Sequence, residues 1–257
     1  MFSRAIVRPP GTNYAEGLTR IELGAPDYER ALQQHAAYCE ALARCGLELI
    51  HLQADERYPD STFVEDTSVL TPAGAILTRP GATSRMGEVE SIKETLSHLY
   101  PRVDSIQEPG TLDGGDVCEA GNHFFIGLSE RTNEAGAGQL AELLTSYGYT
   151  SSFVDIRSVK DILHLKSGLA SLGDNRLVVT EALANREEFR GYELVRLSAD
   201  EEYAANCVRV NDQVLIAAGY PIFEQTLREL GYETIALEMT EFQKMDGGLS
   251  CLSLRFS

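Results

Sequence analysis

Short apolar segments and turn residues alternate along this chain in a recurring order. The clearest copies begin at 63–66, 114–117, 164–167 and 205–208, and their second apolar segments are 75–77, 124–126, 177–179 and 214–216. The intervening turns contain Gly74, Gly121, Asn175 and Asn211. Gly and Asn tolerate the positive φ that tight hairpin turns need. The pattern therefore predicts four strand–turn–strand units.

Helical periodicity is present between several of these units. The segment 27–45 has Asp27 as its expected N-cap, because an aspartate oxygen can accept a free N–H of the first turn. Segments 133–147 and 221–230 also place apolar residues on one face, whereas 185–190 is short and weakly patterned. The expected inner faces are Ala31, Leu32, His35, Tyr38, Leu42 and Cys45 in the first helix, Leu140, Leu143, Leu144 and Tyr147 in the second, and Phe223, Thr226, Leu227 and Leu230 in the third.

The two chain ends each supply half of such a unit. Residues 249–256 form an expected strand with no partner after it, and residues 5–8 form one with no hairpin before it. Joining them makes a fifth copy, and five copies that close on themselves suggest a propeller-like ring without exposed sheet edges. We expect one α/β domain over residues 1–257. An ordinary α/β sandwich with hairpins is the alternative.

Composition narrows the class of protein. Of the 257 residues, 43% are hydrophobic and 24% charged, which is typical of a soluble globular protein. Lys plus Arg number 22 and Asp plus Glu number 39, so the net charge is −17. Such a surface repels nucleic acid and anionic lipid, and it is compatible with a cationic small-molecule substrate. We expect no nucleic-acid partner and no membrane partner.

Motifs for binding metals, phosphates or dinucleotides are missing from the sequence. The five cysteines have no zinc-type spacing, and there is neither a phosphate-binding loop nor a dinucleotide fingerprint. We therefore expect no metal and no cofactor. The start of the chain has no signal-peptide pattern, so a reduced cytoplasmic location with free thiols is the default.

The expected first strands carry chemically unusual residues. If these strands meet at an axis, one pocket holds a thiol, an imidazole and several carboxylates. Each residue also has an ordinary structural interpretation: a buried Cys is a small hydrophobe, a buried His can be a satisfied core residue, and Asp beside Gly-Gly is typical of turns. Arg85 and Arg131 occupy equivalent places before helices, where a solvated arginine is common. The candidates on these strands are Asp60, Glu65, Asp66, Asp113, Asp116, His164, Asp246 and Cys251.

Taken together, these segments resemble the guanidino-group-modifying superfamily and, within it, the dimethylarginine dimethylaminohydrolases. The matching stretches span nearly the whole chain in the family's order, which is more specific than any single motif. They are Arg8-Pro9-Pro10, Phe63-Val64-Glu65-Asp66, Thr78-Arg79-Pro80-Gly81-Ala82, Gly110-Thr111-Leu112-Asp113-Gly114-Gly115-Asp116, Arg131-Thr132-Asn133, Leu163-His164-Leu165-Lys166-Ser167, Ala204-Ala205-Asn206-Cys207 and Asp246-Gly247-Gly248-Leu249-Ser250-Cys251.

The resemblance implies a five-bladed ββαβ propeller and a set of roles. Cys251 would be the nucleophile and His164 the general acid/base, with Asp113 orienting the histidine. Bacterial relatives often have Glu where Asp113 stands. Leu18, in a mobile segment, would cover the substrate as a lid.

The chemistry of the substrate assigns further roles. A guanidinium is planar and cationic, so Asp66 and Asp246 are suited to hold it by paired hydrogen bonds, with Glu65 in support. The resemblance gives Arg85 and Arg131 to the α-carboxylate, and Asp60 with the Leu18 carbonyl to the α-ammonium.

The predicted reaction is the hydrolysis of asymmetric dimethylarginine or monomethylarginine. It would yield citrulline and an amine through a covalent thiouronium on Cys251, whose thiolate would form mainly when substrate arrives. The nearest alternatives are arginine deiminase, agmatine deiminase and amidinotransferase activities. A non-catalytic binder of arginine-like ligands and a redox-sensing role for the thiols are others. A homodimer is compatible with the sequence, which does not determine the oligomer.

Overall fold

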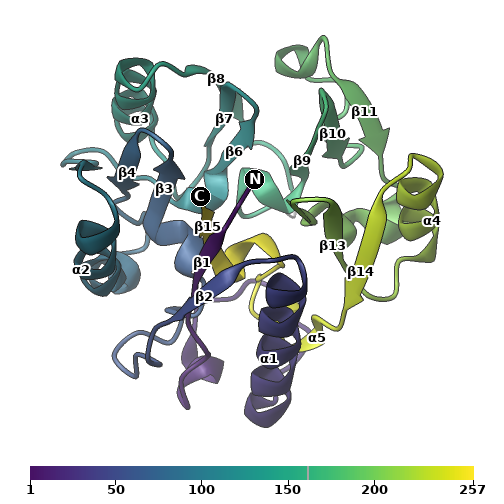
Figure 1. Cartoon of the computed structure of the whole chain (residues 1–257), viewed down its shortest axis with the longest axis horizontal. Coiled ribbons are helices and arrows are strands. Elements are labelled where there is room, and N and C mark those ends of the chain that lie inside the picture. The colour runs from purple at the N-terminus through teal and green to yellow at the C-terminus, as the bar shows by residue number, and fades with distance from the viewer. Residues whose placement is uncertain (161) are drawn as a thin grey trace. The chain divides into compact units, whose positions relative to one another are not determined.

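The computed structural model describes residues 1–160 and 162–257, and in them five three-stranded sheets repeat one pattern (Figure 1). In each sheet the middle strand pairs antiparallel with one neighbour and parallel with the other, as β7 does with β6 and β8. The sheets are β15-β1-β2, β3-β4-β5, β6-β7-β8, β9-β10-β11 and β12-β13-β14. The strands are β1 Arg4–Val7, β2 Glu48–His51, β3 Ser68–Thr71, β4 Gly74–Leu77, β5 Val103–Ser105, β6 Val117–Ala120, β7 His123–Leu128, β8 Thr150–Asp155, β9 Leu169–Gly173, β10 Arg176–Val179, β11 Glu193–Arg196, β12 Val208–Val210, β13 Gln213–Ala217, β14 Glu233–Leu237 and β15 Ser253–Phe256.

The described chain divides into two compact units. The first contains Met1–Val64 and Asn206–Ser257, and the second contains Glu65–Ala205. The first unit holds the sheets β15-β1-β2 and β12-β13-β14, and the second holds the other three. A single domain over residues 1–257 stays a prediction.

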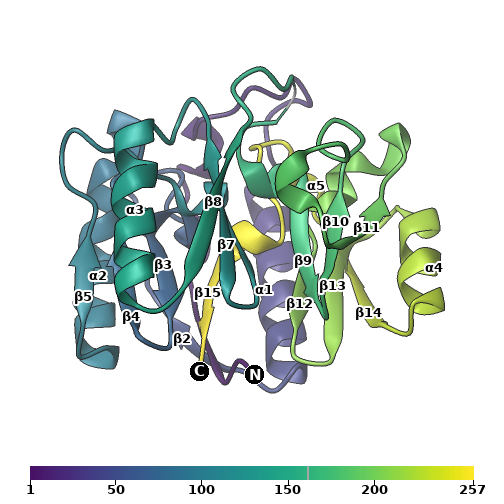
Figure 2. The same cartoon turned by 90° about the horizontal axis from the view of Figure 1, so that it is seen from above.

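The predicted fifth copy forms from both chain ends in the first unit. Strand β1 pairs antiparallel with β15, with Ile6 opposite Leu254, and parallel with β2, with Ile6 opposite Ile50. The two termini lie side by side at one end of this sheet (Figure 2), where the Ser257 hydroxyl donates to the Met1 carbonyl at 2.6 Å. The hydrophobic pattern alone predicted this pairing of the most distant parts of the chain.

The predicted turns have the expected backbone. Gly121, Asn175 and Asn211 have φ of 68°, 60° and 56°, which lie in the left-handed region that Gly and Asn tolerate best. Each turn joins the two antiparallel strands of its sheet. Local turn chemistry is therefore sufficient to place these hairpins.

Three of the helices agree with the predicted segments. Asp27 caps α1 by accepting the Arg30 N–H at 2.8 Å, although Leu32 and Cys45, expected on the inner face, are only half-buried. Only the 3₁₀ turn Glu187–Phe189 forms in 185–190, and α2 lies outside the predicted elements, although its buried Ile92 and Leu96 have helical spacing. The helices are α1 Tyr28–Arg44, α2 Val89–Leu99, α3 Glu134–Ser146, α4 Pro221–Glu229 and α5 Thr240–Gln243.

The core of the second unit lies between neighbouring sheets. One cluster packs Phe125 of β7 against Leu169 of β9 and Leu177 of β10. Another packs Ile76 of β4 against Ile126 of β7 and Leu140 of α3. Because Leu165 belongs to the first cluster, the residue directly after His164 is anchored in the core.

One prediction about the site segments is wrong. None of the candidate residues lies on the first strands. Glu65, Asp66, Asp116 and Cys251 lie in 3₁₀ turns directly before them, which are Val64–Thr67, Gly114–Asp116 and Ser250–Leu252. Asp113 and His164 immediately precede the 3₁₀ turns Gly114–Asp116 and Leu165–Ser167, and Asp60 and Asp246 lie in other turns. Gly and Asp, which recur in these segments, have low strand propensity. Polar side chains, described below, accept several of the N–H groups that a strand ladder would otherwise use. Further 3₁₀ segments are Tyr14–Glu16, Thr83–Glu88 and Ala199–Ala205.

No helix among the described residues combines the length and apolar character needed to cross a lipid bilayer.

Candidate functional site

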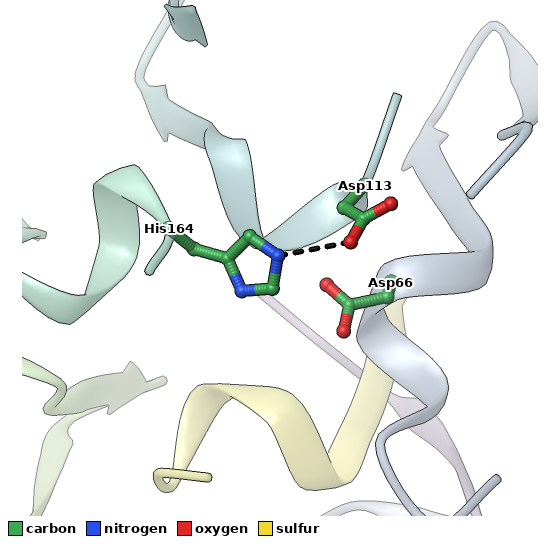
Figure 3. A group of neighbouring side chains, drawn as sticks. All are labelled: Asp66, Asp113 and His164. Carbon is green, nitrogen blue, oxygen red and sulfur yellow. Dashed lines mark hydrogen bonds and ion pairs between the residues drawn. The ribbon is translucent and has the colours of Figure 1, made fainter. Parts of the chain in front are cut away.

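A buried histidine–aspartate pair is the centre of the second unit's site. His164 Nε2 lies 2.9 Å from Asp113 Oδ2, and both side chains are buried (Figure 3). The other oxygen of Asp113 accepts the Gly81 N–H at 2.8 Å. The carboxylate is thus fixed by backbone on one side and orients the imidazole on the other, as a general acid/base requires.

Asp66 lies beside this pair (Figure 3). Its Oδ1 accepts the Gly115 N–H at 2.8 Å, and its Oδ2 accepts from Arg85 Nη1 at 2.6 Å. One donor atom from each of Asp66, Asp113 and His164 lies within 4.8 Å of the others, close enough to surround an ion. Because His164 and Asp113 bind each other and Asp66 binds Arg85, we interpret the group as proton-transfer machinery.

The acids set the charge of the imidazole. Burial alone would lower the pKa of His164, but the charge of Asp66, the hydrogen bond that His164 donates to Asp113 and the charge of Asp116 raise it to about 9. Burial would raise the pKa of Asp66, but His164 and Arg85 outweigh it and lower that pKa to about 2. At neutral pH this unit therefore presents an imidazolium beside a carboxylate.

Arg85 is buried between two acids. Its Nε and Nη2 donate to Glu88 at 3.0 and 2.8 Å, and its Nη1 donates to Asp66. Burial would lower the pKa of this guanidinium, but Glu88 and Asp66 raise it well above its usual value. The predicted role of Arg85 at the substrate's α-carboxylate stays a prediction. Glu88 was missed because nothing in its local sequence marks it as a partner of a buried cation.

Two other predicted residues lie in this unit. Glu65 forms an ion pair of 2.7 Å with Lys166, and both side chains are largely buried. Arg131 is half-buried, and its guanidinium has no hydrogen bond or ion pair with any described residue. Its backbone is packed tightly, since a Cβ on Gly81 would come within 2.2 Å of the Arg131 carbonyl oxygen.

Cys251 lies in the first unit. It is 9% exposed, and it follows Ser250 in a 3₁₀ turn. The Asn206 amide fixes this turn: its oxygen accepts the Ser250 N–H at 2.8 Å, and its nitrogen donates to the Ser250 hydroxyl at 3.2 Å. A Cβ on Gly248 would lie 2.5 Å from Asn206 Cγ, so a glycine is needed there. The predicted convergence of Cys251 with His164 stays a prediction.

Three side chains share one structural role that the sequence analysis missed. Asp66 accepts Gly115 N–H, Asp116 accepts Leu165 N–H at 2.9 Å, and Asn206 accepts Ser250 N–H. Each acceptor lies just before the first strand of one sheet (β3, β6 or β12), and each donor lies in the corresponding turn before the first strand of the next sheet along the chain. Aligning the repeats would have found this recurrent polar position.

The predicted lid segment is held by acids of the first unit. The Asp60 carboxylate accepts the Leu18 N–H at 3.0 Å, and Asp246 Oδ2 accepts the Arg20 N–H at 2.6 Å. Thr19 also donates its hydroxyl to the Lys244 carbonyl at 2.9 Å, while the Leu18 side chain is 41% exposed. The structure thus brings Leu18 and Asp60 together through the backbone N–H of Leu18. The expected use of the Leu18 carbonyl and Asp60 at the α-ammonium stays a prediction.

Comparisons with known proteins agree with this arrangement. The family model described as N,N dimethylarginine dimethylhydrolase, eukaryotic, matches residues 25–248. The N(G),N(G)-dimethylarginine dimethylaminohydrolase of Pseudomonas aeruginosa is 45% identical over 257 residues, which cover 100% of both chains.

Solved structures agree over the same length. A crystal form of the Pseudomonas aeruginosa enzyme, a cysteine-to-serine mutant complexed with citrulline, matches with a TM-score of 0.97 at 44% identity and covers 100% of both chains. A histidine-to-glycine variant of a dimethylarginine dimethylaminohydrolase, as an adduct with S-methyl-L-thiocitrulline, matches with a TM-score of 0.96 at 44% identity and the same full coverage. The predicted α/β five-bladed ββαβ propeller is confirmed by these matches and by the five repeated sheets. By sequence, family model and fold, the chain belongs to the dimethylarginine dimethylaminohydrolase family.

Proposed function

We propose that this protein is a dimethylargininase that hydrolyses Nω-methylated arginines to citrulline and dimethylamine or methylamine. The observation that carries the proposal is the buried His164–Asp113 pair, whose imidazole is kept protonated beside the carboxylate of Asp66. A protonated histidine can donate to a departing amine, which is the difficult part of breaking a guanidinium C–N bond. Family membership supports the same reaction.

In the first step, the thiolate of Cys251 attacks the guanidinium carbon and forms a C–S bond. The electron pair of the C–N bond leaves with dimethylamine, and His164 gives its proton to that nitrogen. A thiouronium on Cys251 remains. Asp113 holds the imidazole in place through its 2.9 Å bond.

In the second step, the now neutral His164 removes a proton from water, and the water oxygen attacks the thiouronium carbon. The C–S bond breaks, and its electron pair returns to sulfur as thiolate. The second proton of the attacking water passes to solvent, where the released amine takes it up, and citrulline departs. The overall balance is one methylated arginine plus water to citrulline plus amine. No cofactor or metal enters this scheme.

Substrate recognition is proposed to use carboxylates for the cationic groups and arginines for the anionic one. Asp66 and Asp246 would hold the guanidinium, with Glu65 in support, because carboxylates make paired, charge-assisted bonds to its N–H groups. Arg85 and Arg131 would bind the α-carboxylate. Asp60 and the Leu18 carbonyl would bind the α-ammonium.

Product analysis tests the proposal directly. Purified protein is incubated with asymmetric dimethylarginine, and citrulline and dimethylamine are measured together; equal amounts of both are expected. Incubation with arginine, assayed for ammonia, tests the deiminase alternative. Cys251→Ala should lower turnover by several orders of magnitude, whereas Cys45→Ala, which removes a half-buried thiol, should not. Normal turnover in Cys251→Ala would refute the mechanism.

A double variant tests whether the two catalytic residues act on one substrate. Residues that act as a unit are strongly non-additive, so Cys251→Ala combined with His164→Ala should be no slower than the worse single variant. Multiplicative losses would contradict a shared site.

The α-carboxylate assignment is best tested at Arg131. Arg85→Ala would leave Asp66 and Glu88 without their buried counter-ion, which confounds any kinetic effect with instability. Arg131→Ala removes a guanidinium that has no ion pair with a described residue, so the fold should tolerate it. We expect KM for dimethylarginine to rise about tenfold or more, with little change for a decarboxylated analogue. Equal effects on both substrates would refute the assignment.

We also propose a homodimer, with the catalytic machinery of each chain in one domain over residues 1–257, and a cytoplasmic location. Light scattering of the purified protein tests whether it is a homodimer. A monomer mass at assay concentration would exclude the dimer.

A further inference from the structure

A second buried aspartate, Asp116, has no part in the reaction above. Its side chain is 0% exposed and accepts three hydrogen bonds. Oδ1 accepts the Leu165 N–H at 2.9 Å, and Oδ2 accepts the hydroxyls of Ser129 and Thr132, each at 2.6 Å. Bonds to an ionised acceptor are stronger than neutral ones, so this carboxylate holds two separate segments together.

The first segment is the turn that carries His164. Leu165 directly follows it, so the bond to Asp116 fixes the peptide from which the imidazole projects. Gly127 on β7 makes the approach possible, since a Cβ there would lie 2.9 Å from both Asp116 Oδ1 and Leu165 Cβ. The contact therefore depends on the absence of a side chain on the neighbouring strand.

The second segment is Ser129–Thr132, which carries Arg131. The Ser129 hydroxyl oxygen accepts the N–H groups of Arg131 and Thr132 at 2.9 and 3.0 Å. The Thr132 hydroxyl oxygen accepts the Asp113 N–H at 3.2 Å. Both hydroxyls already accept from backbone, so their own protons point to Asp116. A carboxylate, which only accepts, fits this place, and an amide does not.

We propose that Asp116 is a positioning residue that couples the turn of His164 to the loop of Arg131. The proposal rests on the proposed function, in which these residues serve opposite ends of the substrate. One buried carboxylate then fixes the position of His164, the proposed general acid, relative to Arg131, the predicted contact of the α-carboxylate. Loss of the carboxylate disturbs both ends together, whereas loss of one hydroxyl disturbs only the loop.

The charge of Asp116 gives a second, independent test of the proposal, through the pH at which His164 titrates. The titratable groups that raise the pKa of His164 are Asp66, Asp113 and Asp116, and they act against burial. Removing the charge of Asp116 while keeping its shape should move the titration of His164 to lower pH. If Asp116 had only a structural role, its replacement would not change the pH at which His164 titrates.

Three variants separate these effects: Asp116→Asn, Ser129→Ala and Asp104→Asn. The last is the matched control, because Asp104 also accepts from two side chains, Arg102 and Tyr147, in the same unit away from the His164 turn. For each variant we measure the melting temperature, kcat and KM for asymmetric dimethylarginine, and the imidazole titration of His164 by NMR without substrate.

We expect kcat of Asp116→Asn to fall about 10²-fold or more, with the His164 titration at lower pH. Ser129→Ala should raise KM about tenfold with the titration unmoved, and Asp104→Asn should change neither. A folded Asp116→Asn with wild-type kcat and titration overturns the proposal. If that variant does not fold, an unchanged KM in Ser129→Ala overturns it instead. Should the wild type form no citrulline, the proposed function fails, while the NMR titration still decides the link between Asp116 and His164.

Discussion

Gly115 offers a sharp test of the site because its missing side chain leaves room for two functional groups. A Cβ at this position would lie 2.8 Å from Asp66 Oδ1 and 2.8 Å from both Cγ and Nδ1 of His164. Ordinary van der Waals contact begins at 3.4 Å, so the ring and the carboxylate must each move by about 0.6 Å. Gly115→Ala should therefore act on the chemistry through geometry alone, without removing any charge.

The size of the effect follows from that displacement. The bond between His164 and Asp113 is 2.9 Å long, and a shift of this size takes it past the limit of about 3.2 Å for a good hydrogen bond. Since a misplacement of about 1 Å can cost about 10²-fold in rate, we expect kcat to fall about 10- to 100-fold. Overpacking should also cost about 1–3 kcal/mol of stability, partly offset by about 0.4–1 kcal/mol from replacing a glycine.

The assay is citrulline release under saturating dimethylarginine, with calorimetric melting in parallel. Gly138→Ala is the control, because Gly138 lies in α3 and an added Cβ there meets nothing within 4 Å. Helix propensity predicts that the control gains about 0.5–1 kcal/mol with unchanged kcat. A folded Gly115→Ala with wild-type kcat would refute the claim that the imidazole position limits the rate.

Three further predictions concern the same groups. Asp113→Asn keeps the shape but removes the charge, so kcat should fall about 10²- to 10⁴-fold in single-turnover experiments; a loss below tenfold would contradict its orienting role. The folded pKa of His164 is about 9, above its ordinary 6.5. The protonated imidazole therefore stabilises the folded state by an amount on the order of 3 kcal/mol. This stabilisation is complete below pH 6.5 and disappears as pH rises through 9. Urea unfolding from pH 6 to 10 should therefore bring wild type and His164→Gln closer together, and a constant difference would exclude the shift. Asn206→Ala leaves the buried Ser250 N–H unpaired and should cost about 1–3 kcal/mol, whereas Asn206→Asp retains an acceptor; equal melting temperatures in both variants would contradict the hydrogen bond.

The residue pattern of the chain is enough to predict most of the repeat. Gly121, Asn175 and Asn211 place turns because the φ they adopt is a property of the residue itself. Asp27 caps α1 because the cap needs only an N–H three residues away. The pairing of β1 with β15 follows from two unpartnered strands that must bury their edges. Each of these features depends on single residues or on short residue patterns, so it can be predicted from the sequence.

Tertiary structure decided how the site residues are held. The bonds that the Gly115 N–H donates to Asp66 and the Leu165 N–H donates to Asp116 each join residues 49 apart in the chain. The segments at Gly115 and Leu165, expected as strands, are 3₁₀ turns whose N–H groups bind these distant carboxylates. Arg85 is bound by Asp66 and by Glu88, which no motif marks. Its expected place at the substrate stays a prediction.

The protonation state of the His164 imidazole is also determined by the tertiary structure. His164 by itself would titrate near neutrality, and burial alone would make it neutral. Three carboxylates that lie far from it in sequence keep it charged up to about pH 9. Hydrophobic periodicity and turn chemistry act over a few residues, so the sequence specifies the repeating scaffold. Electrostatic fields and hydrogen bonds act through space, so only the folded chain fixes which acids surround a given base.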